Sequence, residues 1–158
     1  MIIFNNKNFF LTIFFLSIGS ILSAIYIEYF LGVKPCALCI YQRLPYVAAI
    51  FVCFLGINYH KNILWNYLII VIFLMSAGLS GYHIGIENGF FVELASCKNE
   101  SINVTDKEKL LEAMKTTNVS CKDVNFTILG FSLATINLII SLTVIIVGTM
   151  FAKNVKNK

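Results

Sequence analysis

The segment PCALCIYQR (residues 35–43) carries two cysteines, Cys36 and Cys39, at a spacing suited to redox chemistry. Two cysteines three positions apart at the start of a helix can close a tight, strained ring, and the helix amino terminus lowers the pKa of a nearby thiol. A strained pair of this kind is easily reduced and re-formed, which an exchange catalyst needs and a structural bridge does not. The motif therefore predicts thiol–disulfide exchange.

Two further cysteines, Cys97 and Cys121, form a second candidate pair. A bridge between them would close a loop of about 25 residues and stabilise the fold by about 3 kcal/mol as a structural staple. Beside a Cys-x-x-Cys pair, they are better interpreted as the outer disulfide of a two-step relay of thiol–disulfide exchange. Zinc binding by four cysteines is disfavoured, because such sites usually offer two Cys-x-x-Cys knuckles. The fifth cysteine, Cys53, has apolar neighbours and is interpreted as an inert buried thiol.

Arg43 and the pair His83 and Glu87 are the polar side chains placed to assist these thiols. Arg43 follows Cys39 by four positions, so a helix would put both on one face, where the charge favours a Cys39 thiolate or a developing quinone oxyanion. The alternative is an arginine that extends to the lipid head groups. His83 and Glu87 are also four apart and would hold a quinone carbonyl or manage its protons, or serve only as interfacial polar residues. Asn137 is interpreted as an interhelical hydrogen-bonding residue.

The elements that must position these residues are transmembrane helices. Hydrophobic residues make up 58% of the 158 residues and charged residues 13%, with a mean hydropathy of +0.82. A helix of about 20 apolar residues crosses the hydrocarbon core of a bilayer. The sequence therefore predicts a single all-α membrane domain, a four-helix bundle, and excludes a nucleic-acid surface. The expected spans are residues 9–29, 40–57, 64–86 and 126–151, the first being a retained signal anchor.

Charge is segregated between the two sets of loops. Lysines without any acid occupy the N-terminal tail, the connection after the second span and the C-terminal tail, whereas all eight acids lie at or in the opposite loops, residues 30–39 and 87–125. The positive-inside rule then predicts cytoplasmic termini and two outside loops that hold four of the five cysteines. Disulfides persist on that side of a membrane, so the cysteine placement agrees with the charge pattern.

Two shorter patterns predict local packing. Residues 105–108 fit a capping box, and an apolar stripe at Leu110, Leu111 and Met114 indicates a short amphipathic helix at the outer membrane surface. Ala77, Gly81 and Gly85 have the spacing of small residues at close helix contacts.

Several segments, in order along nearly the whole chain, resemble the DsbB family of bacterial disulfide-bond formation proteins. They are PCALCIYQR, the segment GYHIGIENG at residues 81–89, the cysteine soon after it, and SCKDVNFTILGFSLATINL at residues 120–138. The resemblance implies a protein of the bacterial inner membrane. The vitamin K epoxide reductase family performs related chemistry, but there the Cys-x-x-Cys follows the loop pair, and here the order is reversed.

The resemblance also implies a mechanism. A reduced periplasmic thioredoxin-fold oxidase of the DsbA type would attack a Cys97–Cys121 disulfide, and exchange through Cys36 would pass the electrons to the Cys36–Cys39 pair. Cys39, nearest Arg43, would react with ubiquinone or menaquinone, with His83 and Glu87 beside the quinone and no metal involved. Such a scheme is plausible energetically because its partner oxidase, near −120 mV, needs a stronger oxidant. The alternative is a structural tetraspan protein whose disulfides are only staples.

Overall fold

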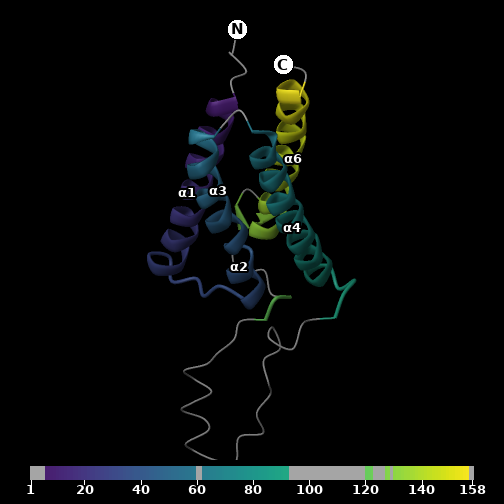
Figure 1. Cartoon of the computed structure of the whole chain (residues 1–158). Helices are drawn as coiled ribbons and strands as arrows, with labels where there is room; N and C mark the ends of the chain where they lie inside the picture. Colours follow the sequence, from purple (N-terminus) through teal and green to yellow (C-terminus); the bar gives the residue numbers. More distant parts are fainter. Residues whose placement is uncertain (1–5, 60–61, 93–119, 123–126, 129, 157–158) are drawn as a thin grey trace, which may run out of the picture.

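Four long helices form a bundle in the computed structural model, which describes residues 6–59, 62–92, 120–122, 127–128 and 130–156 (Figure 1). The helices are α1 (Asn6–Tyr29), α2 and α3 (Ala37–Tyr41 and Leu44–Asn58), α4 (Ile63–Glu87) and α6 (Leu133–Lys156). Within the described residues, four segments, with α2 and α3 counted as one, are long and apolar enough to cross a membrane. The predicted all-α four-helix membrane bundle is confirmed.

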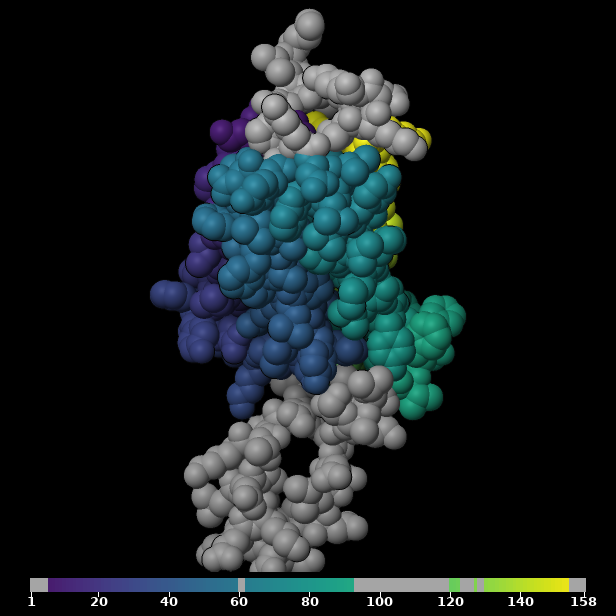
Figure 2. Space-filling model, viewed as in Figure 1, coloured from purple at the N-terminus to yellow at the C-terminus, as the bar shows by residue number. Residues whose placement is uncertain are grey.

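The bundle is apolar outside and partly polar inside. Large side chains such as Phe51 and Met75 are about two-thirds exposed, at 67% and 65%. Ser76, Ser80 and Ser141, in contrast, are completely buried. Lipid is as apolar as these outer side chains, so interior polar groups and small residues hold membrane helices together. Side chains of α1, α3 and α4 form a continuous surface on the face shown in Figure 2.

The helices pack most extensively in two pairs, α1 with α3 and α4 with α6, and α3 joins them by packing on α4. Small residues permit close contact at Gly56, where an added Cβ would lie 2.8 Å from the Phe10 ring, and at Gly148, beside Ile70. The prediction of helix contact at Gly81 and Gly85 is wrong. Gly81 faces open space, and Gly85 instead makes room for the Phe91 ring after α4.

The second span is broken in two, which the sequence prediction of a continuous helix at 40–57 missed. The helix α2 ends at Tyr41, a turn includes Gln42 and Arg43, and α3 begins at Leu44. Pro45 explains the break, because it has no N–H to donate to Tyr41 and its ring clashes with that carbonyl. The turn directs Gln42 inward, where it is buried.

The last span also begins later than expected. Thr127–Ile128 (β1) and Phe131–Ser132 (β2) pair as short antiparallel strands, so α6 starts at Leu133 and not at residue 126. Gly130, with φ of +84°, lies in the connection, in a conformation that costs glycine little. The Ser132 hydroxyl accepts a hydrogen bond from the backbone N–H of Thr135 at 3.2 Å and caps the helix.

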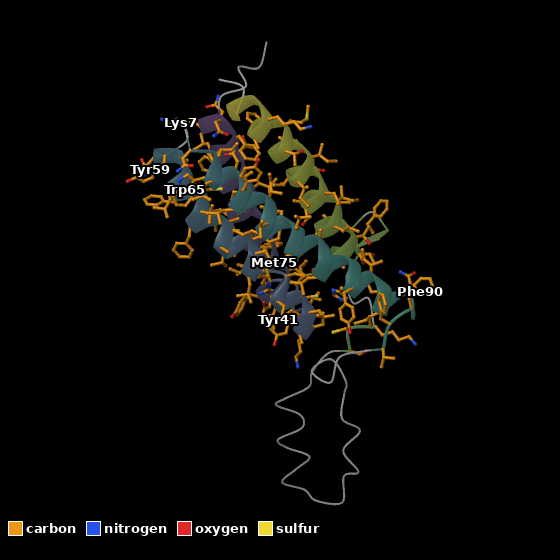
Figure 3. The ribbon with its side chains drawn as sticks, turned by 45° about the vertical axis from the view of Figure 1, so that its right-hand side comes forward. Lys7, Tyr41, Tyr59, Trp65, Met75 and Phe90 are labelled. Carbon is orange, nitrogen blue, oxygen red and sulfur yellow. The ribbon has the colours of Figure 1, made fainter. Side chains whose placement is uncertain are left out.

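The two ends of the bundle carry different residues. The start of α1 and the end of α6 lie at one end (Figure 1), where Lys7, Tyr59 and Trp65 are found, whereas Phe90 lies at the other (Figure 3). Tyr59 and Trp65 stack with ring centroids 6.4 Å apart, as is typical of aromatic residues at a membrane interface. The Cys-x-x-Cys segment lies toward the Phe90 end. The amphipathic helix predicted after residue 105 lies outside the described residues.

Candidate active site

The two cysteines of the Cys-x-x-Cys motif lie side by side at the start of α2. Cys36 is the N-cap of this helix, and its sulfur accepts a hydrogen bond from the backbone N–H of Cys39 at 3.2 Å. The two Sγ atoms are 2.8 Å apart, and both residues carry free thiols. Cys36 is 6% exposed, whereas Cys39 is half-buried. The pair is thus in its reduced form, with sulfurs close enough to form a bond by a small movement.

His83 of α4 faces the Cys36 sulfur. Its Nε2 atom lies 3.7 Å from Cys36 Sγ and also 3.7 Å from Glu87 Oε1, so the predicted pairing of His83 with Glu87 is present. Its Nδ1 atom lies 3.1 Å from the amide nitrogen of Gln42. The histidine is 4% exposed and is therefore held on both ring nitrogens by buried partners.

These neighbours change the acidity of Cys36. The hydrogen bond with the Cys39 side chain, assisted by His83, outweighs the opposing effect of burial and lowers the pKa of Cys36 from 9.0 to about 5. A thiol with this pKa is a thiolate at neutral pH. Because thiolates are the attacking and leaving groups of disulfide exchange, Cys36 has the electronic character that the chemistry requires.

Cys121 lies against the same pair. It is 1% exposed and packs in a cluster with Cys36, Leu38 and Ile86. It belongs to a disulfide, and its backbone is close enough to His83 to interact with it. Cysteines that are far apart in the sequence are therefore brought together at one end of the bundle. Cys97 lies outside the described residues.

Arg43 forms an ion pair with Glu28, at the end of α1. The Arg43 Nη1 and Glu28 Oε2 atoms are 2.7 Å apart, and the two side chains are 26% and 28% exposed. Arg43 thus has a specific protein partner and is more than an arginine extended to the lipid surface. The ion pair neutralises much of its charge, while the unused N–H groups of the guanidinium can still donate to a ligand.

A cavity of about 490 Å³ joins these groups. Its polar end is lined by the side chains already described, and its deeper walls are aliphatic residues of α1 and α6, such as Leu16, Ile136 and Ile140. The size and the mainly apolar lining with convergent polar groups are typical of sites for organic ligands. The polar residues that line the cavity are Ser20, Ser23, Glu28, Lys34, Cys36, Cys39, Gln42, Arg43, Tyr46, His83, Glu87 and Asn137.

Cys36, Cys39 and His83 also have the ligand atoms of a metal site, which lie within 4.8 Å of one another. Two thiolates that bind one zinc ion at about 2.3 Å in tetrahedral geometry are about 3.8 Å apart. The sulfurs here are 2.8 Å apart and are too close for both to bind one ion in this arrangement. The geometry suits exchange between sulfurs better than coordination.

The cavity unites most of the residues singled out from the sequence, namely Cys36, Cys39, Arg43, His83, Glu87 and Asn137. Among the polar residues that sequence reasoning missed are Glu28 and Gln42. Glu28 had a signal, because an acid at the end of an apolar span needs a partner. Gln42 directly precedes Arg43 in the motif, but only the break at Pro45 directs it inward.

The fold and the site define a multi-pass membrane protein with a redox-type dithiol at a ligand-sized cavity. The sequence matches the family model of the disulfide bond formation protein DsbB over residues 6–151, and the chain belongs to this family. It is therefore a membrane protein of disulfide bond formation.

Individual relatives are distant. An uncharacterized protein of Rickettsia prowazekii is 27% identical over 137 residues, which cover 83% of this chain and 78% of that protein. The disulfide bond formation protein B of Acinetobacter baumannii is 28% identical over 118 residues, 70% of this chain and 69% of that protein. The protein of the same name from Ralstonia nicotianae is 29% identical over 83 residues, 52% of each chain.

Proposed function

We propose that this chain is a thiol:quinone oxidoreductase, which re-oxidises a periplasmic DsbA-type thioredoxin-fold oxidase and passes the electrons to ubiquinone or menaquinone. The observation that carries the proposal is the placement of a reduced Cys-x-x-Cys pair at the polar end of an apolar cavity of about 490 Å³. A structural staple has no need of such a cavity. A lipid-soluble electron acceptor needs both the apolar walls and access to a thiol.

The electrons move in pairs along a chain of sulfur bonds. The two thiols of the partner oxidase become a disulfide as the Cys97–Cys121 disulfide is reduced. The resulting thiols then reduce a Cys36–Cys39 disulfide, so that a bond forms between Cys97 and Cys121 and the one between Cys36 and Cys39 breaks. Finally the Cys36–Cys39 disulfide re-forms, and its two electrons with two protons convert quinone to quinol. The contact of Cys121 with Cys36 in one buried cluster supports the second step.

The remaining polar residues have roles that follow from their positions. Arg43, held by Glu28 at 2.7 Å, would donate a hydrogen bond to a quinone oxygen as negative charge develops there. His83 would stabilise the Cys36 thiolate through Nε2 at 3.7 Å, and Glu87 would orient the imidazole. The cavity fits a quinone, because its aliphatic walls match an isoprenoid chain and its polar end offers donors to the ring oxygens.

The proposed localisation is the bacterial inner membrane, with both termini cytoplasmic and the cysteine end periplasmic. The lysine-rich tails and the acidic loops support this orientation by the positive-inside rule. An oxidising compartment on the cysteine side is also where a thiol oxidase would meet its partners.

The test uses the purified full chain in detergent with a reduced thioredoxin-fold oxidase and a short-chain ubiquinone analogue. Quinone reduction is followed by absorbance. Replacing Cys39→Ser is expected to lower turnover at least about 100-fold, because the last disulfide can no longer form. The matched control is Cys53→Ser, at a thiol that is buried in the core away from the cavity and should leave turnover unchanged. Undiminished quinone reduction by Cys39→Ser would refute the relay.

A further inference from the structure

A line of buried hydrogen bonds crosses the bundle from the middle of α4 to Cys36. It runs from the Ser76 carbonyl through Ser80, Asn137, Gln42 and His83, with contacts of 2.8, 2.7, 3.3 and 3.1 Å in that order. All four of these side chains are at most 8% exposed. Because buried donors need acceptors, the direction of each bond in the line follows from which of its atoms can donate and which can accept.

The direction is set at the Ser76 carbonyl, which can only accept. Ser80 donates its single hydroxyl proton to this oxygen at 2.8 Å. Its oxygen must therefore accept from Asn137, which is possible only if the amide presents its nitrogen, as it does at 2.7 Å. Tyr46 donates to the carbonyl oxygen of the same amide and agrees with this orientation.

The second proton of the Asn137 amide fixes Gln42. The Asn137 nitrogen donates to Gln42 Oε1 at 3.3 Å, so the Gln42 nitrogen is turned toward His83 Nδ1 at 3.1 Å. A donor faces Nδ1, and Nδ1 must therefore be the unprotonated nitrogen of the ring. The proton of neutral His83 is then on Nε2.

The opposite side of the ring is compatible with a proton on Nε2. Nε2 lies 3.7 Å from Cys36 Sγ and 3.7 Å from Glu87 Oε1, and because both atoms can accept, a proton on Nε2 agrees with this side of the ring. A doubly protonated His83 would put an N–H of Nδ1 against the amide protons of Gln42. The contact with Gln42 thus favours the Nε2–H tautomer over any form of the ring that carries a proton on Nδ1.

We propose that Gln42, oriented by Asn137, is a positioning residue that holds His83 as the neutral Nε2–H tautomer and so directs a fixed hydrogen-bond donor at Cys36. His83 then acts as a donor to this sulfur and not as the base that deprotonates it. The catalytic consequence, though not the tautomer itself, rests on the proposed function. When the bond between Cys36 and a loop cysteine breaks and the loop disulfide forms, Cys36 leaves as a thiolate that the Nε2–H stabilises.

The tautomer is measured directly by ¹⁵N NMR of the reduced full chain in detergent, with ¹⁵N-labelled histidine. The chain has two histidines, and His60→Gln leaves His83 as the only signal. At pH 7 we expect one protonated nitrogen, Nε2, and one bare nitrogen, Nδ1. A proton on Nδ1, alone or together with Nε2, would overturn the proposal without any variant of the site.

The variant Gln42→Glu reverses the contact at Nδ1. A carboxylate still accepts from Asn137 but now offers an acceptor to the ring, so both nitrogens of His83 should be protonated at pH 7. The matched control is Ser141→Ala. Ser141 lies one turn after Asn137, is completely buried and donates to the Ser76 hydroxyl at 3.0 Å, outside the line to His83. In the Ser141→Ala variant, His83 should keep the Nε2–H tautomer.

Unchanged ring nitrogens in Gln42→Glu, or a changed tautomer in Ser141→Ala, would each contradict the assignment. The spectra require no turnover. A chain that shows the expected tautomers but does not reduce quinone would retain this inference and refute the proposed function. A chain that reduces quinone but carries the proton on Nδ1 would refute this inference and retain the proposed function.

Discussion

At the residue scale, the site distinguishes its two thiols. Cys36 accepts a hydrogen bond from the Cys39 backbone N–H, lies 2.8 Å from the Cys39 sulfur and faces His83, whereas Cys39 is the more exposed of the two; both line the cavity with Arg43. A relay needs this difference. One sulfur must exchange with the loop cysteines while the other remains available to the electron acceptor.

The acidity of Cys36 gives a pH prediction. Its pKa is lowered to about 5 from 9.0, so the thiolate is present above pH 5 and is lost as the pH falls through that value. At pH 7 Cys36 is therefore mostly thiolate, whereas an unperturbed thiol is mostly protonated. The rate of Cys36 alkylation in the reduced chain should therefore be constant from pH 6 to 8 and fall tenfold per unit below pH 5.

Alkylation is mapped by mass spectrometry after short exposure to iodoacetamide, so that Cys36 is followed separately from other thiols. The variant His83→Asn, which removes one hydrogen-bond partner of the sulfur, should move the midpoint upward. A midpoint between pH 8 and 9 in the unmodified chain would show that the surroundings do not favour the thiolate.

Much of this residue-level chemistry was predictable. The spacing of Cys36 and Cys39 indicates exchange, and the four-residue spacing of His83 and Glu87 predicts a contact that the structure contains. Gln42 was not predictable as the partner of His83, because its orientation depends on Asn137 in another helix. Hydrogen bonds between distant segments leave no local pattern in one sequence.

At the scale of elements, the break between α2 and α3 is what shapes the site. Apolar runs predict the spans well, since their length must match the bilayer. They do not predict where a span is interrupted. Here Pro45 carried the missing signal, because a proline inside an apolar run ends or kinks the helix before it.

Replacing Pro45→Ala tests the role of the break. Alanine restores the N–H that can donate to the Tyr41 carbonyl and removes the cost of about 3 kcal/mol that proline would impose on a continuous helix, which offsets the lost contacts of the buried ring. A straighter helix would move Gln42 away from His83. We expect turnover to fall at least about tenfold while the unfolding midpoint does not decrease, because small displacements in a site are costly.

Thermal unfolding by circular dichroism and quinone reduction are measured on the same preparation. The control is Cys53→Ser, at a buried thiol of α3 that does not line the cavity. Full activity in Pro45→Ala would mean that the break is not needed to position the site.

At the scale of the whole molecule, the cavity exists because the four long helices do not pack equally closely against one another. α1 packs mainly on α3, and α4 on α6, while contact between α1 and α6 is slight. The cavity takes its walls from both of these helices. No single helix forms the site, which is why composition predicts a membrane bundle but not the space within it.

Filling this cavity from α1 tests whether it receives the electron acceptor. Gly19 lines the cavity, and an added Cβ meets no atom within 4 Å, so Gly19→Phe can place a ring there without a clash at the backbone. Phenylalanine is also a better helix former than glycine, by a few tenths of a kcal/mol, and stability should not fall. We expect the KM for the quinone analogue to rise at least about tenfold, with little change in the rate of exchange with the reduced partner oxidase.

The matched control is Gly78→Phe on α4. Gly78 likewise has no atom within 4 Å of an added Cβ and, like Gly19, is exposed, but it does not line the cavity. The same substitution should there leave the KM unchanged. Equal kinetics for the two variants would indicate that the quinone reaches the thiols by another route, since only Gly19→Phe obstructs the space that α1 and α6 leave between them.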